Sequence, residues 1–302
     1  MKGYKALDKD MRAMHGNEMR YELGKTYSVD DEIILGKRGF HFCEKIEYLN
    51  ICYDIANSRV FEVEAGGDII AYDNKYVAQA IKLVRELTKQ EISDYFRENH
   101  EKLCENEDAY VRCAVAEQGY GLNELVYDKV WFVREAVAEQ GYGLDILVHD
   151  EEGFVRETVA KQGYGLDELV CDKEWIIRCA VAEQGYGLDK LICDKDWHVR
   201  RTVAKQGYGL DKLIRDKDWG VRLAVAEQGY GLDVLVHDKY YEVRRAVAEQ
   251  GYGLEILVND ESKMVRSAVA KQGYGLDILI HDKKLAVRNM AREMCNERQG
   301  CQ

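Results

Sequence analysis

The chain has 302 residues, of which 46% are hydrophobic and 32% are charged, a composition typical of a folded globular protein and not of a disordered chain. Its formal net charge is −12, and the two parts share it equally: residues 1–110 carry 16 Lys and Arg against 22 Asp and Glu, and residues 111–302 carry 27 against 33. A general nucleic-acid binder gains affinity by neutralising phosphates with Lys and Arg, so this balance argues against direct nucleic-acid binding.

The chain also lacks the sequence features of membrane and secreted proteins. No apolar run approaches the ~18 residues that span a bilayer, and the first residues, MKGYKALDKDMRAM, lack the apolar core of a signal peptide. The nine cysteines are an odd number and form no CxxC motif, so they do not indicate a disulfide framework or a zinc module. We therefore expect a cytoplasmic protein with reduced thiols and no membrane contact.

Residues 1–75 mix β-branched and aromatic residues with turn-forming Gly and Asp, which is typical of strands. Residues 75–88, KYVAQAIKLVRELT, then place apolar side chains close to helical spacing and predict an amphipathic helix. A second helix, EISDYFRENHEKL, is expected to cover the open end of the following repeats. We predict a small α+β domain over 1–88 and a linking and capping helix over 89–110.

Four residues of this first part carry chemistry: His41 in GFHFC, Tyr53, and Ser58 and Glu64 in SRVFEVEA. This order is similar to compact ADP-ribosyltransferase folds, and the resemblance implies that the four are catalytic candidates for a nucleotide or NAD-like substrate. The alternative interpretation makes His41 a half-buried strand residue and places Glu64 in solvent. His41 and Cys43 alone are too few for a metal site. No phosphate-binding glycine loop or nucleophile elbow occurs, so we predict no metal and no cofactor.

The same segment carries a second resemblance. Gly24–Tyr27, Gly39–Cys43, Tyr53 and Ser58–Glu64 resemble an uncharacterised domain at the N-terminus of phage and prophage proteins. The resemblance implies a phage or mobile-element origin, and it implies no activity.

The rest of the chain is a repeat. The stretch VRCAVAEQGYGLNELVYDKVWF, residues 111–132, recurs seven more times at steps of 22 residues without an insertion, and a truncated ninth copy begins at Val287. A fixed period in this range is the signature of a solenoid, in which stacked units bury surface that no single unit can bury. We predict eight repeats over 111–286 and a C-terminal cap over 287–302.

Each repeat is predicted to hold two helices. In the second copy, Asp128 is expected to cap a long helix that ends at Gln140, because an aspartate at this position accepts hydrogen bonds from the first free amides. Gly141 ends that helix. Residues 144–149 form a shorter helix, and at this length only packing can hold it.

The pattern VRxxVA followed by LxxLxxD, over residues 111–295, resembles leucine-rich repeat variant and HEAT-like repeats. The resemblance implies a mainly α fold, a right-handed α-solenoid of paired helices with a buried ladder of Asp against Arg. The aspartates would be Asp128, Asp150, Asp172, Asp194, Asp216, Asp238 and Asp260, and the arginines Arg134, Arg156, Arg178, Arg200, Arg222, Arg244 and Arg266.

Positions that vary between repeats are candidates for binding. One slot holds Trp131, Trp175, Trp197 and Trp219, and it accepts Gly153 and Lys263 elsewhere, so it is not fully buried. Exposed Trp is typical of interface anchors, but Trp that covers a joint between repeats is the alternative. The corner tyrosines, which include Tyr142, Tyr164, Tyr186 and Tyr208, form either an exposed aromatic strip or a lid over neighbouring glycines.

Charge also varies along the array. The copy at 133–154 has a net charge of −5, and the copy at 199–220 has a net charge of +3 that includes Arg201, Lys212 and Arg215. Such a bipolar surface orients a charged partner. The sequence therefore predicts a protein–protein interaction scaffold, from a phage or prophage, that binds a host or anti-phage defence protein. Two alternatives remain: an enzyme with an ADP-ribosyltransferase-like N-terminal domain that the repeats target, and an acidic mimic of nucleic acid.

Overall fold

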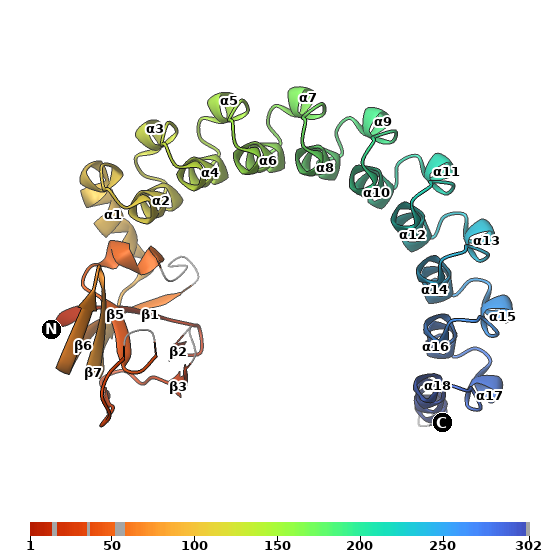
Figure 1. Ribbon diagram of the computed structural model, residues 1–302, viewed down its shortest axis with the longest axis horizontal. Helices are drawn as coiled ribbons and strands as arrows, with labels where there is room; N and C mark the ends of the chain where they lie inside the picture. The colour runs from red at the N-terminus through yellow and green to blue at the C-terminus, as the bar shows by residue number, and fades with distance from the viewer. Residues whose placement is uncertain (14–16, 35–36, 52–57, 300–302) are drawn as a thin grey trace. The chain divides into compact units, whose positions relative to one another are not determined.

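The computed structural model describes residues 1–13, 17–34, 37–51 and 58–299 (Figure 1). The chain divides into two compact units, Met1–Gln162 and Gly163–Gln302. Within the described residues, a small sheet region comes first and regular pairs of helices follow, so the predicted mainly α fold of repeated helix pairs after an α+β region is confirmed. No described helix combines the length and the apolar character that crossing a membrane requires.

The first unit begins with a sheet whose described strand pairings are all antiparallel. Its strands are β1 (Lys2–Leu7), β4 (Thr26–Ser28), β5 (Phe40–Cys43), β6 (Arg59–Tyr72) and β7 (Lys75–Glu86), beside a small pair of β2 (Arg12–Ala13) and β3 (Asn17–Arg20) and a 3₁₀ turn η1 (Ile46–Ile51). The strand order is β4-β7-β5-β1-β6, and β6 also pairs with β7. The strands β7, β5, β1 and β6 therefore close into a ring around an apolar core that includes Phe40, Phe42 and Phe61.

The helix predicted over residues 75–88 is wrong, because these residues form strand β7. Val77, Ile81 and Leu83 are completely buried, whereas Val84 is 41% exposed. Ile81 and Leu83 are two residues apart and both belong to the apolar core, so they share one face of a strand, where side chains alternate. The long partner β6 supplies the backbone hydrogen bonds along this segment, and this pairing outweighs the local helical pattern.

Helix α1 (Lys89–Cys104) follows the sheet and confirms the predicted second helix. A capping box begins it: the Thr88 side chain accepts from the Glu91 N–H, and the Glu91 carboxylate accepts from the Thr88 N–H. Ile92, Phe96 and Leu103 form its buried face. Helix α1 packs on the first helix of the array, as expected for a cap.

The repeats alternate long helices with one-turn helices. The first unit contains α2 (Ala109–Glu117), α3 (Leu122–Leu125), α4 (Trp131–Glu139), α5 (Leu144–Leu147) and α6 (Gly153–Lys161). The second contains α7 (Leu166–Leu169), α8 (Trp175–Glu183), α9 (Leu188–Leu191), α10 (Trp197–Lys205), α11 (Leu210–Leu213), α12 (Trp219–Glu227), α13 (Leu232–Leu235), α14 (Tyr241–Glu249), α15 (Leu254–Leu257), α16 (Lys263–Lys271), α17 (Leu276–Leu279) and α18 (Leu285–Gln299). Within each unit the long helices form one layer and the short helices form another (Figure 1).

Two details of the predicted repeat need correction. Asp128 is not the N-cap of α4, because Val130 holds that position. The Asp128 carboxylate instead accepts from the Val130 N–H at 2.8 Å, in a turn that precedes the helix, and this leaves its other lone pairs for an arginine. The short helix is a single turn, Leu144–Leu147, and it does not extend to residue 149.

Candidate interaction surfaces

A ladder of buried ion pairs holds successive repeats in register. Within each unit, an arginine of one repeat pairs with the aspartate sixteen residues later. Arg178 donates from Nε and Nη2 to the Asp194 carboxylate at 2.6 and 2.8 Å, and from Nη1 to the Asp172 carbonyl at 2.7 Å. The same pairing joins Arg112 to Asp128, Arg134 to Asp150, Arg200 to Asp216, Arg222 to Asp238, Arg244 to Asp260 and Arg266 to Asp282.

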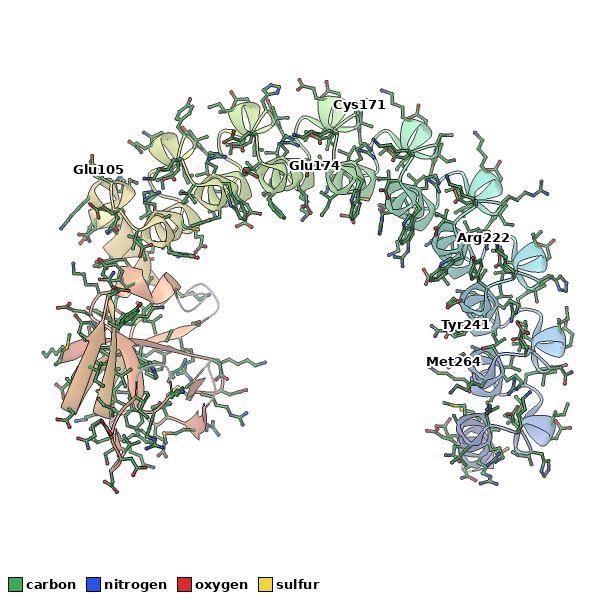
Figure 2. The ribbon with its side chains drawn as sticks, in the orientation of Figure 1. Glu105, Cys171, Glu174, Arg222, Tyr241 and Met264 are labelled. Carbon is green, nitrogen blue, oxygen red and sulfur yellow. The ribbon has the colours of Figure 1, made fainter. Side chains whose placement is uncertain are left out.

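The ladder confirms the buried Asp–Arg rows that the repeat resemblance implies, and it extends them to Arg112 and Asp282. Burial alone would raise the pKa of Asp194, but hydrogen bonds from Arg178 and from the Asp196 N–H outweigh burial and lower this pKa. Figure 2 shows Arg222 between the layer of long helices and the layer of short helices. The ladder aspartates therefore bind the ladder arginines and stabilise the fold, and their carboxylates are not available to a ligand.

An aromatic row runs along the first turns of the long helices. We define it as the aromatic side chains at the first two positions of these helices and at the residue before them. In the first unit, Tyr110 stacks on Phe132 with 5.1 Å between the ring centres, and Trp131 stacks on Phe154, also with 5.1 Å between the centres. Phe132 contacts Trp131 edge to face, with 5.8 Å between the ring centres. These rings pack across the joints between repeats, yet Tyr110 and Phe154 are 52% and 55% exposed.

The row is most densely stacked in the second unit. The His198 ring stacks on both Trp175 and Trp197, with 4.3 Å and 3.7 Å between the ring centres. Its Nδ1 is 2.9 Å from Asp196 Oδ1. Trp197 also covers Gly220, where a Cβ would come within 2.9 Å of the indole. The glycine in the next repeat therefore makes room for the tryptophan.

The row continues toward the end of the array. Trp219 stacks on Tyr240 with 6.0 Å between the ring centres, and Figure 2 shows Tyr241 on the side of the long helices that faces away from the short helices. Met264, which is not aromatic, lies on the same side. Trp219, Tyr241 and Met264 are 36%, 40% and 40% exposed. The tryptophans therefore combine the two alternatives, since they cover joints between repeats and are also partly exposed, as interface anchors are.

The corner tyrosines form a second exposed row. Tyr142, Tyr164, Tyr186 and Tyr208 are all between 41% and 43% exposed, so these rings are partly exposed at the surface. The first corner differs because α1 covers it: Tyr120 makes a 3.0 Å hydrogen bond with Ser93 and lies against the His100 ring.

The three basic candidates do not gather at one place. Arg201 lies on the long helix α10, and its buried Nε has no hydrogen-bond partner among the described residues. Lys212 and Arg215 lie on and just after the short helix α11. The structure therefore assigns Arg201 to one layer and the other two to the opposite layer.

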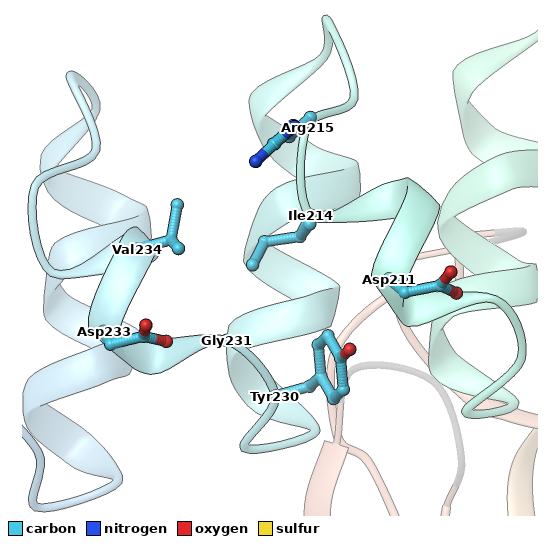
Figure 3. Close-up of a pocket in the computed structure, with 7 residues that line it drawn as sticks. All are labelled: Asp211, Ile214, Arg215, Tyr230, Gly231, Asp233 and Val234. Carbon is cyan, nitrogen blue, oxygen red and sulfur yellow. The ribbon is translucent and has the colours of Figure 1, made fainter.

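Arg215 lines a pocket of about 500 Å³ between α11 and α13 (Figure 3). Ile214 and Gly231 form its floor, Tyr230 closes one end, and Val234 stands on the α13 side. The pocket is also lined by Asp211 and Asp233. Among the described residues, none makes an ion pair with Arg215, Asp211 or Asp233, so these charges are available to a partner.

The acidic end of the array lies in the first unit. Burial is the main reason why the pKa values of Glu135 and Glu139 on α4 are raised, and repulsion from neighbouring carboxylates raises them further. These glutamates belong to the layer of long helices, whereas Lys212 and Arg215 belong to the layer of short helices. The charge asymmetry predicted from the sequence is thus divided between layers.

The enzyme candidates that the structure describes, His41, Ser58 and Glu64, do not converge. In the sheet, Lys2 faces Glu64 and Tyr4 faces Cys43, so His41 is level with Ala6, about 13 Å along β1 from the level of Glu64. Ser58 precedes β6 by one residue and is roughly 20 Å along the strand from Glu64. Tyr53 lies outside the described residues.

Glu64 does line a pocket of about 230 Å³ on the sheet, together with Lys2, Tyr4, Glu44 and Glu62. Glu62 is already paired with Arg85 at 2.6 Å, and Glu44 accepts from the Tyr76 hydroxyl at 3.0 Å. Within the described parts of the chain, no group of three or more His, Cys, Asp or Glu side chains is placed to hold a metal ion.

Sequence reasoning missed one exposed feature of the short helices. Val234, Ile256 and Ile278 occupy the same slot in successive repeats and are 49%, 46% and 52% exposed. The signal was present in the sequence, because this slot holds Lys190 and Lys212 in other repeats. A position that accepts lysine faces solvent, so three aliphatic residues there are not required by packing.

Comparisons with known proteins gave one family match and matches among solved structures. No curated protein sequence matches the chain. A crystal structure of the Escherichia coli protein YibA matches with 14% identity over 70% of this chain and 98% of that chain, with a TM-score of 0.31. Residues 1–94 match a family described as a domain of unknown function, DUF7666, so this part of the chain is similar to an uncharacterised domain.

Proposed function

We propose that this chain is a protein-binding scaffold and that the aromatic row of its long helices is the binding surface. The observation that carries the proposal is the row itself: tryptophan, tyrosine and phenylalanine recur at fixed positions, stack on one another and stay more than a third exposed at Trp175, Trp219 and Tyr241. Rings that are already held by stacking lose little side-chain freedom on binding, and Trp and Tyr dominate the affinity of protein interfaces.

We also propose that the array belongs with leucine-rich repeat variant and HEAT-like repeats, and that the chain is a phage or prophage protein whose partner is a bacterial host or anti-phage defence protein. The assignment to these repeats is supported by the helix pairs and the Asp–Arg ladder. The phage or prophage origin is supported by the resemblance of Gly39–Cys43 and Ser58–Glu64 to a domain of phage and prophage proteins.

The test is affinity capture from a bacterial lysate with the full chain and with Trp175→Ala and Trp219→Ala. We expect one defined partner, and we expect each substitution to weaken its affinity at least about tenfold, because truncation of an anchor residue costs about 2 kcal/mol. Tyr127→Ala is the matched control, since Tyr127 is 70% exposed but lies outside the aromatic row. The proposal fails if no partner is retained, or if Trp219→Ala and Tyr127→Ala bind alike.

A further inference from the structure

A second surface lies on the layer of short helices, and it begins at the pocket of Figure 3. Val234, Ile256 and Ile278 stand at the third position of three one-turn helices, α13, α15 and α17, and each is about half exposed. In other repeats the same position carries Glu124, Glu168, Lys190 or Lys212. Packing within the repeat therefore does not require an aliphatic side chain there.

Each of these aliphatic residues belongs to a repeat whose corner tyrosine is also exposed. Tyr230 and Val234 line the same pocket, and Tyr230, Tyr252 and Tyr274 are 42%, 43% and 42% exposed. We call the six residues the short-helix stripe: Tyr230, Val234, Tyr252, Ile256, Tyr274 and Ile278. Exposed apolar side chains that gather on one surface of a protein mark an interaction site.

The charged residues that the stripe's own corner and short-helix segments place beside it have a single sign. The corner and short-helix segments 228–238, 250–260 and 272–282 contain no Lys or Arg. Their remaining carboxylates are exposed, one next to each aliphatic residue: Asp233, Glu255 and Asp277. Asp238, Asp260 and Asp282 are neutralised by the ladder arginines. The preceding repeat ends this acidic run with Lys212 and Arg215.

The spacing of the stripe selects the geometry of its partner. The long helices of successive repeats pack on one another, and helices packed in this way lie about 8–10 Å apart. The stripe has one aliphatic residue for each of these repeats, so its residues recur at an interval on the order of 10 Å. An α-helix rises 1.5 Å per residue, and residues seven apart are therefore about 10.5 Å apart on one face. A helix with an apolar residue at every seventh position matches the stripe.

We propose that the short-helix stripe docks a basic amphipathic helix of a partner protein. Apolar side chains spaced by seven residues pack on Val234, Ile256 and Ile278 between the tyrosine rings, and Lys or Arg side chains of the partner pair with Asp233, Glu255 and Asp277. Lys212 and Arg215 repel the basic partner at α11 and so mark the end of the docking site. The inference rests on the proposed protein-binding function and names a second surface and the chemistry of what it binds.

The probe is a synthetic 21-residue helical peptide with three leucines seven residues apart and lysines beside them. Its binding to the full chain is measured by fluorescence anisotropy, alongside a peptide with Glu in place of Lys and a peptide with Gln in place of Leu. We expect the basic apolar peptide to bind, and both altered peptides to bind at least about tenfold more weakly, since charge complementarity and apolar anchors are both needed.

The decisive variant is Ile256→Lys, which places a cation in the middle of the stripe. It is expected to fold, because lysine already occupies this slot at Lys190 and Lys212. We expect its Kd for the basic peptide to rise at least about tenfold. The matched control is Ile146→Lys, since Ile146 fills the same slot at 38% exposure in the first unit, outside the stripe, and its Kd should equal that of the wild type.

Three results would overturn the inference: no binding of the basic peptide, equal binding of the acidic peptide, or equal binding by Ile256→Lys and Ile146→Lys. The aromatic row is tested separately, because Trp219→Ala should leave peptide binding unchanged. Loss of peptide binding with intact partner capture through Trp175 and Trp219 would remove the stripe proposal and keep the scaffold. If the basic peptide binds but partner capture does not depend on Trp175 and Trp219, the stripe proposal stands and the aromatic row is not the binding surface.

Discussion

Lys5 is a single residue whose environment is uncommon for a cation. It is 3% exposed inside the ring of strands, and its Nζ donates to the His41 carbonyl at 2.8 Å and lies 5.4 Å from the centre of the Tyr21 ring. No described carboxylate lies within ion-pair distance of it. Burial therefore lowers the pKa of Lys5 to about 8, because desolvation disfavours its charged form.

This lowered pKa predicts an alkaline gain in stability. Below pH 8 Lys5 is charged in both the folded and the unfolded chain, so its contribution is constant. Between pH 8 and about 10.5 the unfolded chain binds more protons, and stability rises with pH by roughly 3 kcal/mol from this group. Urea unfolding of the wild type and of Lys5→Met should show this change as a growing difference in favour of the wild type. A difference that stays constant with pH would contradict the assignment.

At the scale of the element, the Gly-Tyr-Gly corner determines the orientation of each short helix relative to the long helix that precedes it. Both glycines have positive φ, +72° at Gly229 and +59° at Gly231, which suits glycine and strains other residues. Their surroundings differ. A Cβ at Gly231 would overlap the Ile214 side chain of the preceding repeat, whereas a Cβ at Gly229 would meet only the Gln250 side chain, at 3.9 Å.

The two glycines should therefore respond differently to alanine. Gly229→Ala is expected to lower the free energy of unfolding by about 1–2 kcal/mol, the cost of a left-handed conformation. Gly231→Ala should lower it by about 2–5 kcal/mol, because overpacking against Ile214 adds about 1–3 kcal/mol. Urea unfolding followed by tryptophan fluorescence measures both, and equal losses would show that the inter-repeat contact is not tight.

At the scale of the whole molecule, stability is a sum of repeats and of the joints between neighbours, since a solenoid repeat contacts only its neighbours. The Asp–Arg ladder recurs at these joints, with side chains between 5% and 10% exposed. Removing one partner of a buried pair leaves an uncompensated charge. The array is therefore expected to be acid-sensitive along its length.

Asp216→Asn tests this dependence at one joint. The pKa of Asp216 is lowered because hydrogen bonds from Arg200 and the Asp218 N–H outweigh the effect of burial. A lowered carboxyl pKa contributes stability above the unfolded value, near 3.8, and this contribution is lost as pH falls below it. At pH 7 the variant should lose about 3–5 kcal/mol of unfolding free energy, and the loss should shrink below pH 3.8. Asp211→Asn, which removes an exposed carboxylate, should have no effect at either pH.

The sequence by itself determined much of the array. The period of 22, the pairing of a long helix with a short one and the glycine corners all follow from local patterns that recur in every repeat, and this recurrence strengthens a signal that is weak in a single copy. The Asp–Arg rows are expected only from the resemblance to known repeats. The partial exposure of the Trp slot could also be predicted, because glycine and lysine share that slot.

Only the tertiary structure decided the remainder, because contacts between distant residues control it. Residues 75–86 have helical spacing, but pairing with β6 makes them a strand. Asp128 looks like a helix cap, but an arginine sixteen residues earlier draws its carboxylate into the ladder. Lys212 and Arg201 look like one basic cluster, but they belong to different layers. The local sequence pattern indicates which secondary structures and contacts a segment can form, and tertiary contacts determine which of these it adopts.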